Sequence, residues 1–371
     1  MSEYLEAAFE LAAQGLGRTS PNPAVGAIVV RDGEIVGRGF HTYSGVKHAE
    51  VLALEEAREQ ARGATLYVTL EPCCHQGRTG PCVDAILAAG VRKVVAPIRD
   101  PNPQVAGQGF TRLRDAGVEV ELETSSEARA AELNEPFIHF MRTGLPLVTL
   151  KAALTLDGKI AAPEDDLTSG RTPGWITSEQ ARAHVQTLRH RSDAILTGIG
   201  TVLADDCRLT DRTGLERSRP LLRIVLDSQL RLPPESRLAS SCREDVLVIT
   251  TSAASPERRK RLEALGVRIE VMERRDGRVS LQGVLEWLAR EKYLSLMIEA
   301  GSKVNWSALE SGVADKIFFY YAPKILGGLQ SLPVAGGAGR RRRKDAIRFH
   351  RVRLHSIAPD EFAVEAWLER G

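Results

Sequence analysis

The chain has few of the features that mark membrane or nucleic-acid-binding proteins. Its 371 residues contain no run of about 18 uninterrupted apolar residues, which excludes an ordinary membrane-spanning helix. Aromatic residues make up only 5% of the sequence, and the formal net charge is +2, so no strong basic field is available for nucleic acid. The first residues include Glu3, Glu6 and Glu10 and lack the pattern of a signal peptide. We expect a cytoplasmic protein that binds neither membranes nor nucleic acid.

Cysteine is also scarce, and its distribution argues against a disulfide scaffold. Of the five cysteines, three are close together at Cys73, Cys74 and Cys82, whereas Cys207 and Cys242 stand alone. Such a cluster in a reducing compartment predicts a metal site or a catalytic site.

The length is too great for one ordinary hydrophobic core, so we expect two domains. Up to residue 122, strand patterns alternate with helix patterns, which indicates a sheet covered by helices on both faces. Strand signals lapse between Thr124 and Pro146, and a second strand-rich unit begins at Leu147. We therefore predict an α/β domain over residues 1–145 and another over residues 146–371.

Local patterns predict the elements of each domain. In the first, we expect helices over 3–15, 48–62, 81–89 and 110–115, and strands over 24–30, 35–36, 64–70, 91–96 and 118–122, with a hairpin turn at Asp32-Gly33. In the second, we expect strands over 147–150, 194–196, 222–226, 246–250, 294–298 and 317–321, and helices starting near Thr177, Leu281 and Ser302. The Thr177-x-x-Gln180 spacing resembles a capping box. Gly336–Gly339 is interpreted as a glycine hinge, and the run Arg340–Lys344 as solvated charge, with a binding site as the alternative.

The strongest chemical signal is His48-Ala49-Glu50 followed by Pro72-Cys73 and Pro81-Cys82. One imidazole and two thiolates suit zinc and leave a fourth position for water, as catalytic zinc requires. Glu50 is the candidate acid–base group. His48 and Glu50 can converge only if His48 starts a helix, because residues two apart in mid-helix point about 200° apart. Pro81 suits a first helical turn, whose free N–H groups would favour the Cys82 thiolate.

The motifs around these residues resemble a known family. They are Pro21-Asn22-Pro23-x-Val25-Gly26, His48–Val51, Thr69–Cys73, Gly77–Cys82 and Asp100-Pro101-Asn102-Pro103-x-Val105. All are similar to the bifunctional riboflavin-biosynthesis deaminase/reductase family, which has a cytidine-deaminase-like α/β/α sandwich first. The resemblance implies that His48, Cys73 and Cys82 bind zinc and that Glu50 shuttles protons. It also implies substrate contacts for Asn22, His41, His75, Arg78, Asp100 and Asn102. The alternatives are that Asn22 forms a turn and that Asp100 and Asn102 cap their own loop.

The family carries serine where this chain has Cys74. We expect the Cys74 side chain to point away from the metal, because neighbouring residues in an extended or turn segment diverge.

From residue 147 onward no Gly-x-Gly-x-x-Gly opens a βαβ unit, so a Rossmann site is not expected. Segments Lys151–Lys159, Trp175–Ser178, Ala194–Gly198, Thr201–Asp206, Ile298–Gly301 and Ala322–Gly328 resemble the reductase domain of the same family. The resemblance implies a dihydrofolate-reductase-like α/β fold that uses NADPH to reduce a ribosyl group to a ribityl chain.

The resemblance also assigns residues to the reductase site. The NADPH site would be lined by Ala153, Trp175, Thr201, Asp205, Ser228, Gly301, Ser302, Lys303, Val304, Asn305, Trp306 and Ser307. The substrate positions are Lys151, Thr172, Arg189, Leu209, Arg212 and Glu299. Arginine suits a substrate 5′-phosphate through forked hydrogen bonds, and the N–H groups that begin a helix at Gly301 and Ser302 suit a cofactor phosphate. The alternative for Trp175 is a packing anchor.

We therefore expect a homo-oligomeric enzyme that deaminates a small phosphorylated pyrimidine with zinc and then reduces its ribosyl group with NADPH. The alternatives are a nucleobase or tRNA deaminase with an unrelated C-terminal domain, and a zinc-stabilised binding module that contacts nucleic acid through Arg340–Lys344.

Overall fold

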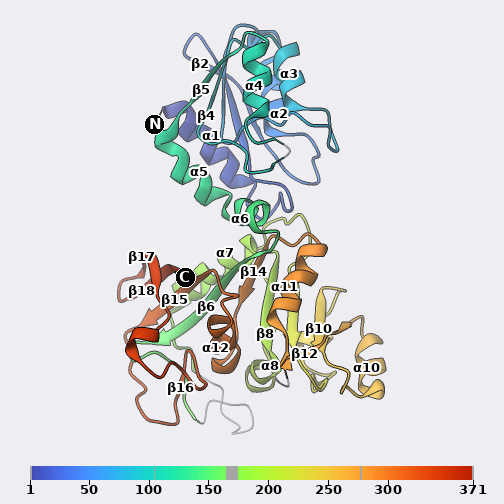
Figure 1. Ribbon diagram of the computed structural model, residues 1–371, viewed down its shortest axis with the longest axis vertical. Coiled ribbons are helices and arrows are strands. Elements are labelled where there is room, and N and C mark those ends of the chain that lie inside the picture. Colours follow the sequence, from blue (N-terminus) through green and yellow to red (C-terminus); the bar gives the residue numbers. More distant parts are fainter. Residues whose placement is uncertain (1, 104, 164–173, 276–277, 370–371) are drawn as a thin grey trace. The chain divides into compact units, whose positions relative to one another are not determined.

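The computed structural model describes residues 2–103, 105–163, 174–275 and 278–369, and the chain divides into two compact units (Figure 1). One unit is Met1–Leu145 with the short segment Glu216–Arg219. The other is Pro146–Leu215 with Pro220–Gly371. Among the described helices, none combines the length and apolar character needed to cross a bilayer.

The first unit is built on a five-stranded sheet of order β2-β1-β3-β4-β5. Its strands are β1 (Gly26–Arg31), β2 (Glu34–Phe40), β3 (Thr65–Val68), β4 (Lys93–Ala96) and β5 (Glu119–Leu122). β1 is antiparallel to β2 and β3, whereas β3, β4 and β5 are parallel. Asp32 and Gly33 have φ of 51° and 84°, so the predicted hairpin turn is confirmed.

Helices cover both faces of this sheet. They are α1 (Glu3–Gln14), α2 (Ala49–Ala57), α3 (Cys82–Ala88), α4 (Gln108–Asp115), α5 (Glu127–Leu133) and α6 (Glu135–Thr143), with 3₁₀ turns η1 (Arg58–Ala61) and η2 (Thr124–Ser126). Ile28 of β1 packs with residues of α1 and α5, whereas Val29, on the opposite face, packs with residues of α2, α3 and α4. The predicted α/β/α sandwich is confirmed.

The second unit contains a nine-stranded sheet of order β11-β10-β9-β8-β14-β6-β15-β18-β17. Its strands are β6 (Leu147–Thr155), β8 (Ala194–Gly198), β9 (Leu222–Leu226), β10 (Val246–Thr250), β11 (Arg268–Val271), β14 (Ser295–Ile298), β15 (Lys316–Ala322), β17 (Phe349–Ala358) and β18 (Glu361–Leu368). The first seven strands in this order, from β11 to β15, are parallel to one another. β18 pairs antiparallel with β15, and β17 pairs antiparallel with β18 to form a hairpin. Two small ribbons pair β7 (Lys159–Ala161) with β16 (Leu332–Pro333) and β12 (Arg274–Arg275) with β13 (Arg278–Val279).

Further helices lie between these strands along the chain. They are α7 (Glu179–Arg191), α8 (Ile199–Asp205), α9 (Arg237–Ser240), α10 (Pro256–Glu263), α11 (Leu281–Arg290) and α12 (Ser302–Glu310). The predicted capping box at Thr177 is wrong by one residue: Ser178 is the N-cap of α7, and its hydroxyl accepts from the Ala181 N–H. β17 and β18 had no counterpart in the prediction: the basic and polar residues of β17 obscure the alternation of a strand, whereas β18, which is mostly apolar, was simply missed.

Two glycines of β2 allow α2 to lie directly on the sheet. A Cβ on Gly37 would overlap the Ala53 carbonyl oxygen, and a Cβ on Gly39 would overlap the Ala49 carbonyl oxygen and the Ala53 nitrogen. Because helix backbone atoms cannot swing aside as a side chain can, a larger residue here must displace the start of α2.

We predict that Gly39→Ala destabilises the first unit alone, by about 1–3 kcal/mol, the usual cost of overpacking. All four tryptophans of the chain (175, 287, 306 and 367) belong to the second unit, so tryptophan fluorescence follows that unit's unfolding. Urea unfolding followed by far-ultraviolet circular dichroism should show an earlier transition, while the fluorescence transition stays in place. Gly80→Ala, where a Cβ meets open space, is the control and should behave as wild type.

Candidate functional site

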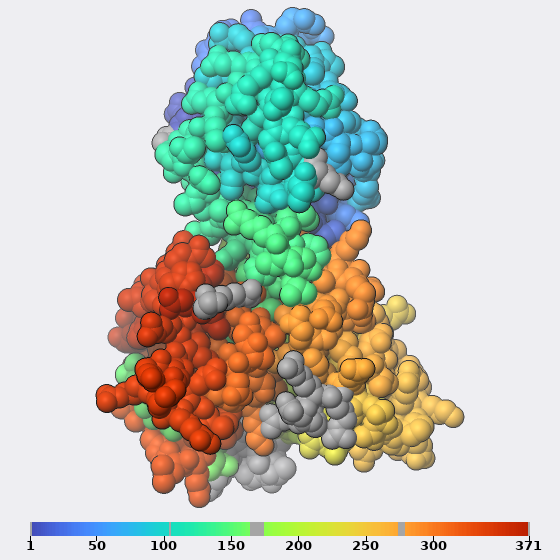
Figure 2. All heavy atoms as spheres, viewed as in Figure 1, coloured from blue at the N-terminus to red at the C-terminus, as the bar shows by residue number. Residues whose placement is uncertain are grey.

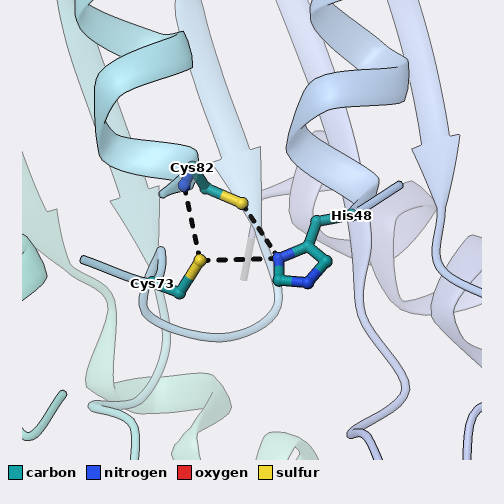
Figure 3. Close-up of side chains that lie close together, drawn as sticks. All are labelled: His48, Cys73 and Cys82. Atoms are coloured by element: carbon teal, nitrogen blue, oxygen red, sulfur yellow. Dashed lines mark hydrogen bonds between the residues drawn. The ribbon is translucent and has the colours of Figure 1, made fainter. Parts of the chain in front are cut away.

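Three soft or borderline ligands converge in the first unit (Figure 3). His48 precedes α2, Cys73 lies in the loop after β3, and Cys82 is the first residue of α3. The His48 Nδ1 lies 3.1 Å from the Cys82 Sγ and 3.5 Å from the Cys73 Sγ. All three ligand atoms lie within 4.8 Å of one another, a spacing that one metal ion could bridge.

The backbone explains why these side chains meet. His48 is the N-cap of α2 with an extended backbone, φ −77° and ψ 159°, so the expectation that it starts the helix is confirmed. Glu50 follows within the first turn and is buried. Pro81 is the N-cap of α3, which places Cys82 at the first helical position. Cys74 packs instead against the apolar cluster that includes residues of α3 and α4, so the expectation that it points away is confirmed.

The start of α3 stabilises a different thiolate from the one expected. The Cys82 N–H donates to the Cys73 Sγ over 3.3 Å, so the prediction that this helix start favours the Cys82 thiolate is wrong. The reason is that the loop carrying Cys73 passes over the first N–H of the helix, which cannot point at its own side chain. Hydrogen bonding from the Cys82 thiol lowers the pKa of Cys73, and the same interaction raises the pKa of Cys82.

Glu50 combines burial with proximity to this cluster. Its side chain is 4% exposed and makes a hydrogen bond with Cys82. Burial, and then the negative charge of Cys73, raise the pKa of Glu50 to about 7. A carboxyl group with a pKa near neutrality can both accept and return a proton.

Asn22 and His41 form a second layer next to His48. The Asn22 Nδ2 donates to the His41 Nε2 over 3.0 Å, and the His41 Nδ1 donates to the Lys47 carbonyl oxygen over 2.9 Å. These partners require a neutral imidazole with its proton on Nδ1, and burial lowers the pKa of His41 in the same direction. The His41 ring lies edge-on to the His48 ring, with 5.3 Å between the centroids.

The remaining residues expected to contact the pyrimidine lie in loops of the same unit. The His75 Nδ1 is buried and has no hydrogen-bond partner among the described residues. Arg78 is exposed, lies over the Tyr43 ring and donates to the Tyr43 carbonyl oxygen. Asp100 accepts from the Asn102 N–H over 2.8 Å, so it caps its own loop. Burial raises the pKa of Asp100 to about 6.

Glu71 holds this loop and was missed by sequence reasoning. One of its carboxylate oxygens accepts from the N–H groups of Asp100 and Gly107, and the other accepts from the Phe110 N–H. The Glu71 side chain thereby ties the residue before Pro72-Cys73 to the loop of Asp100 and to the start of α4. Its signal in the sequence was an acidic residue directly after an apolar strand.

The second unit holds a buried charge cluster. The Lys151 Nζ on β6 lies 3.1 Å from the Glu299 Oε1, and Arg189 on α7 contacts both Glu299 oxygens. Burial alone would raise the pKa of Glu299, but Lys151 and Arg189 lower it to about 2. The third guanidinium nitrogen of Arg189, Nη1, donates to the Thr210 carbonyl oxygen over 2.9 Å. The guanidinium expected to bind a phosphate is therefore already engaged by protein groups.

Leu209 and Arg212 lie in a loop that several side chains fix. Gln186 of α7 accepts from the Arg212 N–H, and Arg223 of β9 donates to the Arg208 carbonyl oxygen. Leu209 is buried with φ of 53°, a backbone conformation that a leucine adopts only when its surroundings impose it. Neither Gln186 nor Arg223 was singled out from the sequence, although Arg223 interrupts an apolar strand.

The residues expected to contact NADPH gather partly at the carboxyl ends of the parallel strands. Thr201 lies in α8 after β8, Ser228 follows β9, and Gly301 follows β14, and such edges are the usual ligand sites of parallel sheets. A Cβ on Gly301 would lie 3.5 Å from the Thr201 Oγ1, so these two positions are adjacent. Gly301 is the N-cap of α12 and, as a glycine, it makes no side-chain capping hydrogen bond to the first N–H groups of the helix.

The other expected cofactor residues are distributed as follows. Asp205 ends α8, Ala153 lies on β6 opposite Tyr320, and residues 302–307 form the first part of α12. Trp175 is 70% exposed and stacks with Arg182. Thr172 lies outside the described residues.

Comparison with known proteins identifies two regions. A family described as "RibD C-terminal domain" matches residues 146–360. A family described as "Cytidine and deoxycytidylate deaminase zinc-binding region" matches residues 1–97.

Full-length relatives match both units together. The chain is 43% identical to the riboflavin biosynthesis protein RibD of Actinobacillus pleuropneumoniae, over 96% of this chain and 93% of that protein. It is 41% identical to RibD of Escherichia coli, over 96% of each. Among solved structures, RibD of Acinetobacter baumannii is 37% identical with a TM-score of 0.85, and the deaminase/reductase of Thermotoga maritima is 36% identical with a TM-score of 0.81. Each structural match covers 99% of this chain and 98% of that one.

We predict that Cys73→Ser loses most bound zinc and all release of ammonia, because it removes one of the three converging ligands. Cys74→Ser is the matched control, one residue away, and should keep both properties. Zinc content by atomic absorption and ammonia release from a diaminopyrimidine substrate would measure the effect. Zinc loss in Cys74→Ser would overturn the proposed ligand set.

Proposed function

Since the chain belongs to the RibD family of riboflavin biosynthesis proteins, we propose how its individual residues serve the two reactions of that family. It is a bifunctional enzyme with a zinc-dependent hydrolytic deaminase and an NADPH-dependent reductase, and it acts on a small phosphorylated pyrimidine. The Thermotoga maritima relative is named as a diaminohydroxyphosphoribosylaminopyrimidine deaminase and 5-amino-6-(5-phosphoribosylamino)uracil reductase. We propose the same two substrates for this chain, with deamination first.

We assign the deaminase to residues 1–145 and the reductase to residues 146–371. The two compact units and the ranges of the two family matches support this division. The match to the RibD C-terminal domain also rules out an unrelated second domain, and with it the alternative of a nucleobase or tRNA deaminase.

The single observation that carries the deaminase assignment is the convergence of His48, Cys73 and Cys82 beside a buried carboxyl group. The donor set fits zinc: one imidazole nitrogen, one thiol with a depressed pKa and a third ligand at the start of α3. Zinc, when bound, supplies activation of the attacking water as a Lewis acid. These three side chains would hold it.

Glu50 then moves the protons. The buried carboxylate takes one proton from the attacking water as oxygen bonds to the ring carbon and passes it to the ring nitrogen. It then takes the proton of the new hydroxyl group and passes it to the leaving amine. The exocyclic amine departs as ammonia, and a carbonyl remains. We propose that Asn22, His41, His75, Arg78, Asp100 and Asn102 bind the pyrimidine. The unpartnered His75 Nδ1 is available for a ring substituent.

In the reductase, we propose that the cofactor phosphates meet α12, because its uncapped N–H groups and the adjacent Thr201 fit an anion. NADPH, when bound, would supply a hydride to C1 of the ring-opened, imine-like ribosyl group, whose nitrogen would take up a proton. Lys151, held by Glu299 in a fixed position, donates to or orients the sugar. Since Arg189 is engaged by Glu299 and Thr210, we assign the substrate phosphate to Arg212, which is exposed.

We also propose that the enzyme works in the cytoplasm, without nucleic acid or membrane as a partner. None of the cysteines that the structure describes forms a disulfide, and two of them belong to the proposed zinc site, which fits a reducing compartment such as the cytoplasm.

We predict that the two activities fail independently. Glu50→Gln should keep its zinc, but its rate of ammonia release should fall by at least about 10²-fold, the usual contribution of general acid–base catalysis. The same variant should still oxidise NADPH when it is given the deaminated aminouracil. Lys151→Ala should release ammonia normally but accumulate the unreduced ribosyl compound. Mass spectrometry of the products, with and without NADPH, would measure both.

Each variant is the control for the other, because each carries one intact site. If Glu50→Gln, while folded, also abolished reduction of the deaminated substrate, the independence of the two sites would be refuted. Ammonia release by Glu50→Gln within tenfold of wild type would remove Glu50 from the mechanism.

We further propose a homo-oligomer that pairs through the edge strand β17. This strand ends the nine-stranded sheet, and its Val352 and Leu354 are exposed. The C-terminal residues, red in Figure 2, form part of the surface of the second unit. Exposed apolar side chains on an edge strand favour association with another chain.

Analytical ultracentrifugation of the wild-type chain should show dimers or larger species. Leu354→Glu should shift the distribution toward monomer, whereas Leu265→Glu, at an exposed position outside β17, is the control and should not. A monomeric wild-type chain would refute the proposal.

A further inference from the structure

Residues 334–337, named here the glycine strap, lie against the first turns of α12. The Gly336 N–H donates to the Ser302 carbonyl oxygen over 3.1 Å, and the Asn305 Nδ2 donates to the Val334 carbonyl oxygen over 2.9 Å. The glycine hinge expected from the sequence is therefore wrong: Gly336 and Gly337 are packed against a helix.

The close approach requires glycine at both positions. A Cβ on Gly336 would overlap the Ser302 Oγ, and a Cβ on Gly337 would overlap the Trp306 ring. Gly337 also has φ of 155°, a conformation that side chains disfavour. Because both glycines meet atoms of α12, the strap is fitted to this helix.

The contacts divide α12 into two faces. Ser302, Asn305 and Trp306 are spaced as neighbours on one face of a helix, and all three meet the strap. Gly301 and Val304 lie elsewhere: the first is adjacent to Thr201, and the second contacts the Gly198 position at the end of β8. The strap and the segment that joins β8 to α8 therefore contact different sides of α12.

The strap is itself anchored to the turn between β6 and β7, and it follows directly on the small ribbon that β16 forms with β7. The Val334 N–H donates to the Gly158 carbonyl oxygen over 3.0 Å, and Leu332 of β16 pairs with Ala161 of β7. The start of α12 is thereby tied to the turn between β6 and β7.

We propose that the glycine strap is a positioning element for NADPH, which holds the N-terminal turn of α12 so that its free N–H groups meet the cofactor phosphates. This inference rests on the proposed NADPH site. It assigns the Ser302 and Trp306 side chains to the strap, and leaves the backbone of Gly301 and Ser302 to the cofactor. The Ser302 Oγ is buried against Gly336 and has no partner among the described residues.

The test compares NADPH binding in glycine variants of the intact enzyme. Gly337→Ala should raise the Kd and KM for NADPH about tenfold or more, while kcat at saturating NADPH stays close to wild type, because the chemistry of the bound complex is unchanged. Gly339→Ala is the control: its φ of 63° is also positive, so it carries the backbone strain of a side chain there, but its Cβ meets open space. Ammonia release should be unaffected in both, since the deaminase belongs to the other unit.

A second pair keeps the proposal testable if Gly337→Ala does not fold. Gly336→Ala should weaken NADPH binding, and adding Ser302→Ala should restore it, because only the Ser302 Oγ overlaps the new methyl group. Ser302→Ala is measured alone as the reference for the double variant, so that any contribution of the hydroxyl itself is separated from relief of the overlap.

The outcomes separate this inference from the proposed function. If the wild-type enzyme failed to bind NADPH in calorimetry, the reductase assignment itself would be refuted. If it bound NADPH and both Gly336→Ala and Gly337→Ala bound it equally well, the strap would have no role in positioning the cofactor. A Ser302→Ala variant with binding as weak as that of Gly336→Ala would place the hydroxyl on the cofactor instead.

Discussion

The packing of α2 on β2 is the constraint on which the deaminase site depends. Gly37 and Gly39 bring the helix backbone against the strand, and this fixes where α2 starts. His48 sits immediately before that start, so its imidazole reaches the two cysteines while Glu50, in the first turn, stays buried beside them. A shift of α2 would therefore move both the His48 imidazole and the Glu50 carboxyl group away from the two cysteines. The chemistry of the site therefore depends on two residues that carry no side chain.

Burial of charge plays the corresponding part in the reductase. Glu299 is surrounded by Lys151 and Arg189, so a carboxylate that would otherwise be costly to bury is stabilised by two cations. The arrangement fixes the Lys151 Nζ at a defined place on β6. It also draws Arg189 away from solvent, whereas Arg212 is exposed. One ion cluster thus fixes the positions of both the Lys151 amine and the Arg189 guanidinium.

Much of this organisation could be predicted from the sequence, for identifiable reasons. His48-Ala49-Glu50 and the two Pro-Cys pairs are local signals whose spacing implies a helix start and a loop, and the hairpin at Asp32-Gly33 follows from backbone preference. What could not be predicted depends on contacts between distant segments. Glu71 acts through N–H groups far along the chain, and the Cys82 N–H reaches Cys73 only once the loop has folded over α3. Gly336 and Gly337 resemble a hinge until α12 lies beside them.

Arg223 shows how a contact between distant segments can restrict which amino-acid substitutions the protein tolerates during evolution. The guanidinium is 1% exposed, and its five N–H donors are all engaged: two by Asp245, two by Ser241 and one by the Arg208 carbonyl oxygen. Lysine offers three donors from a single point and cannot reproduce this planar fork. Substitution at Asp245 or Ser241 would leave part of a buried cation unsatisfied. These positions on separate segments should consequently accept replacements only jointly, so that neutral drift in this part of the reductase proceeds by paired steps.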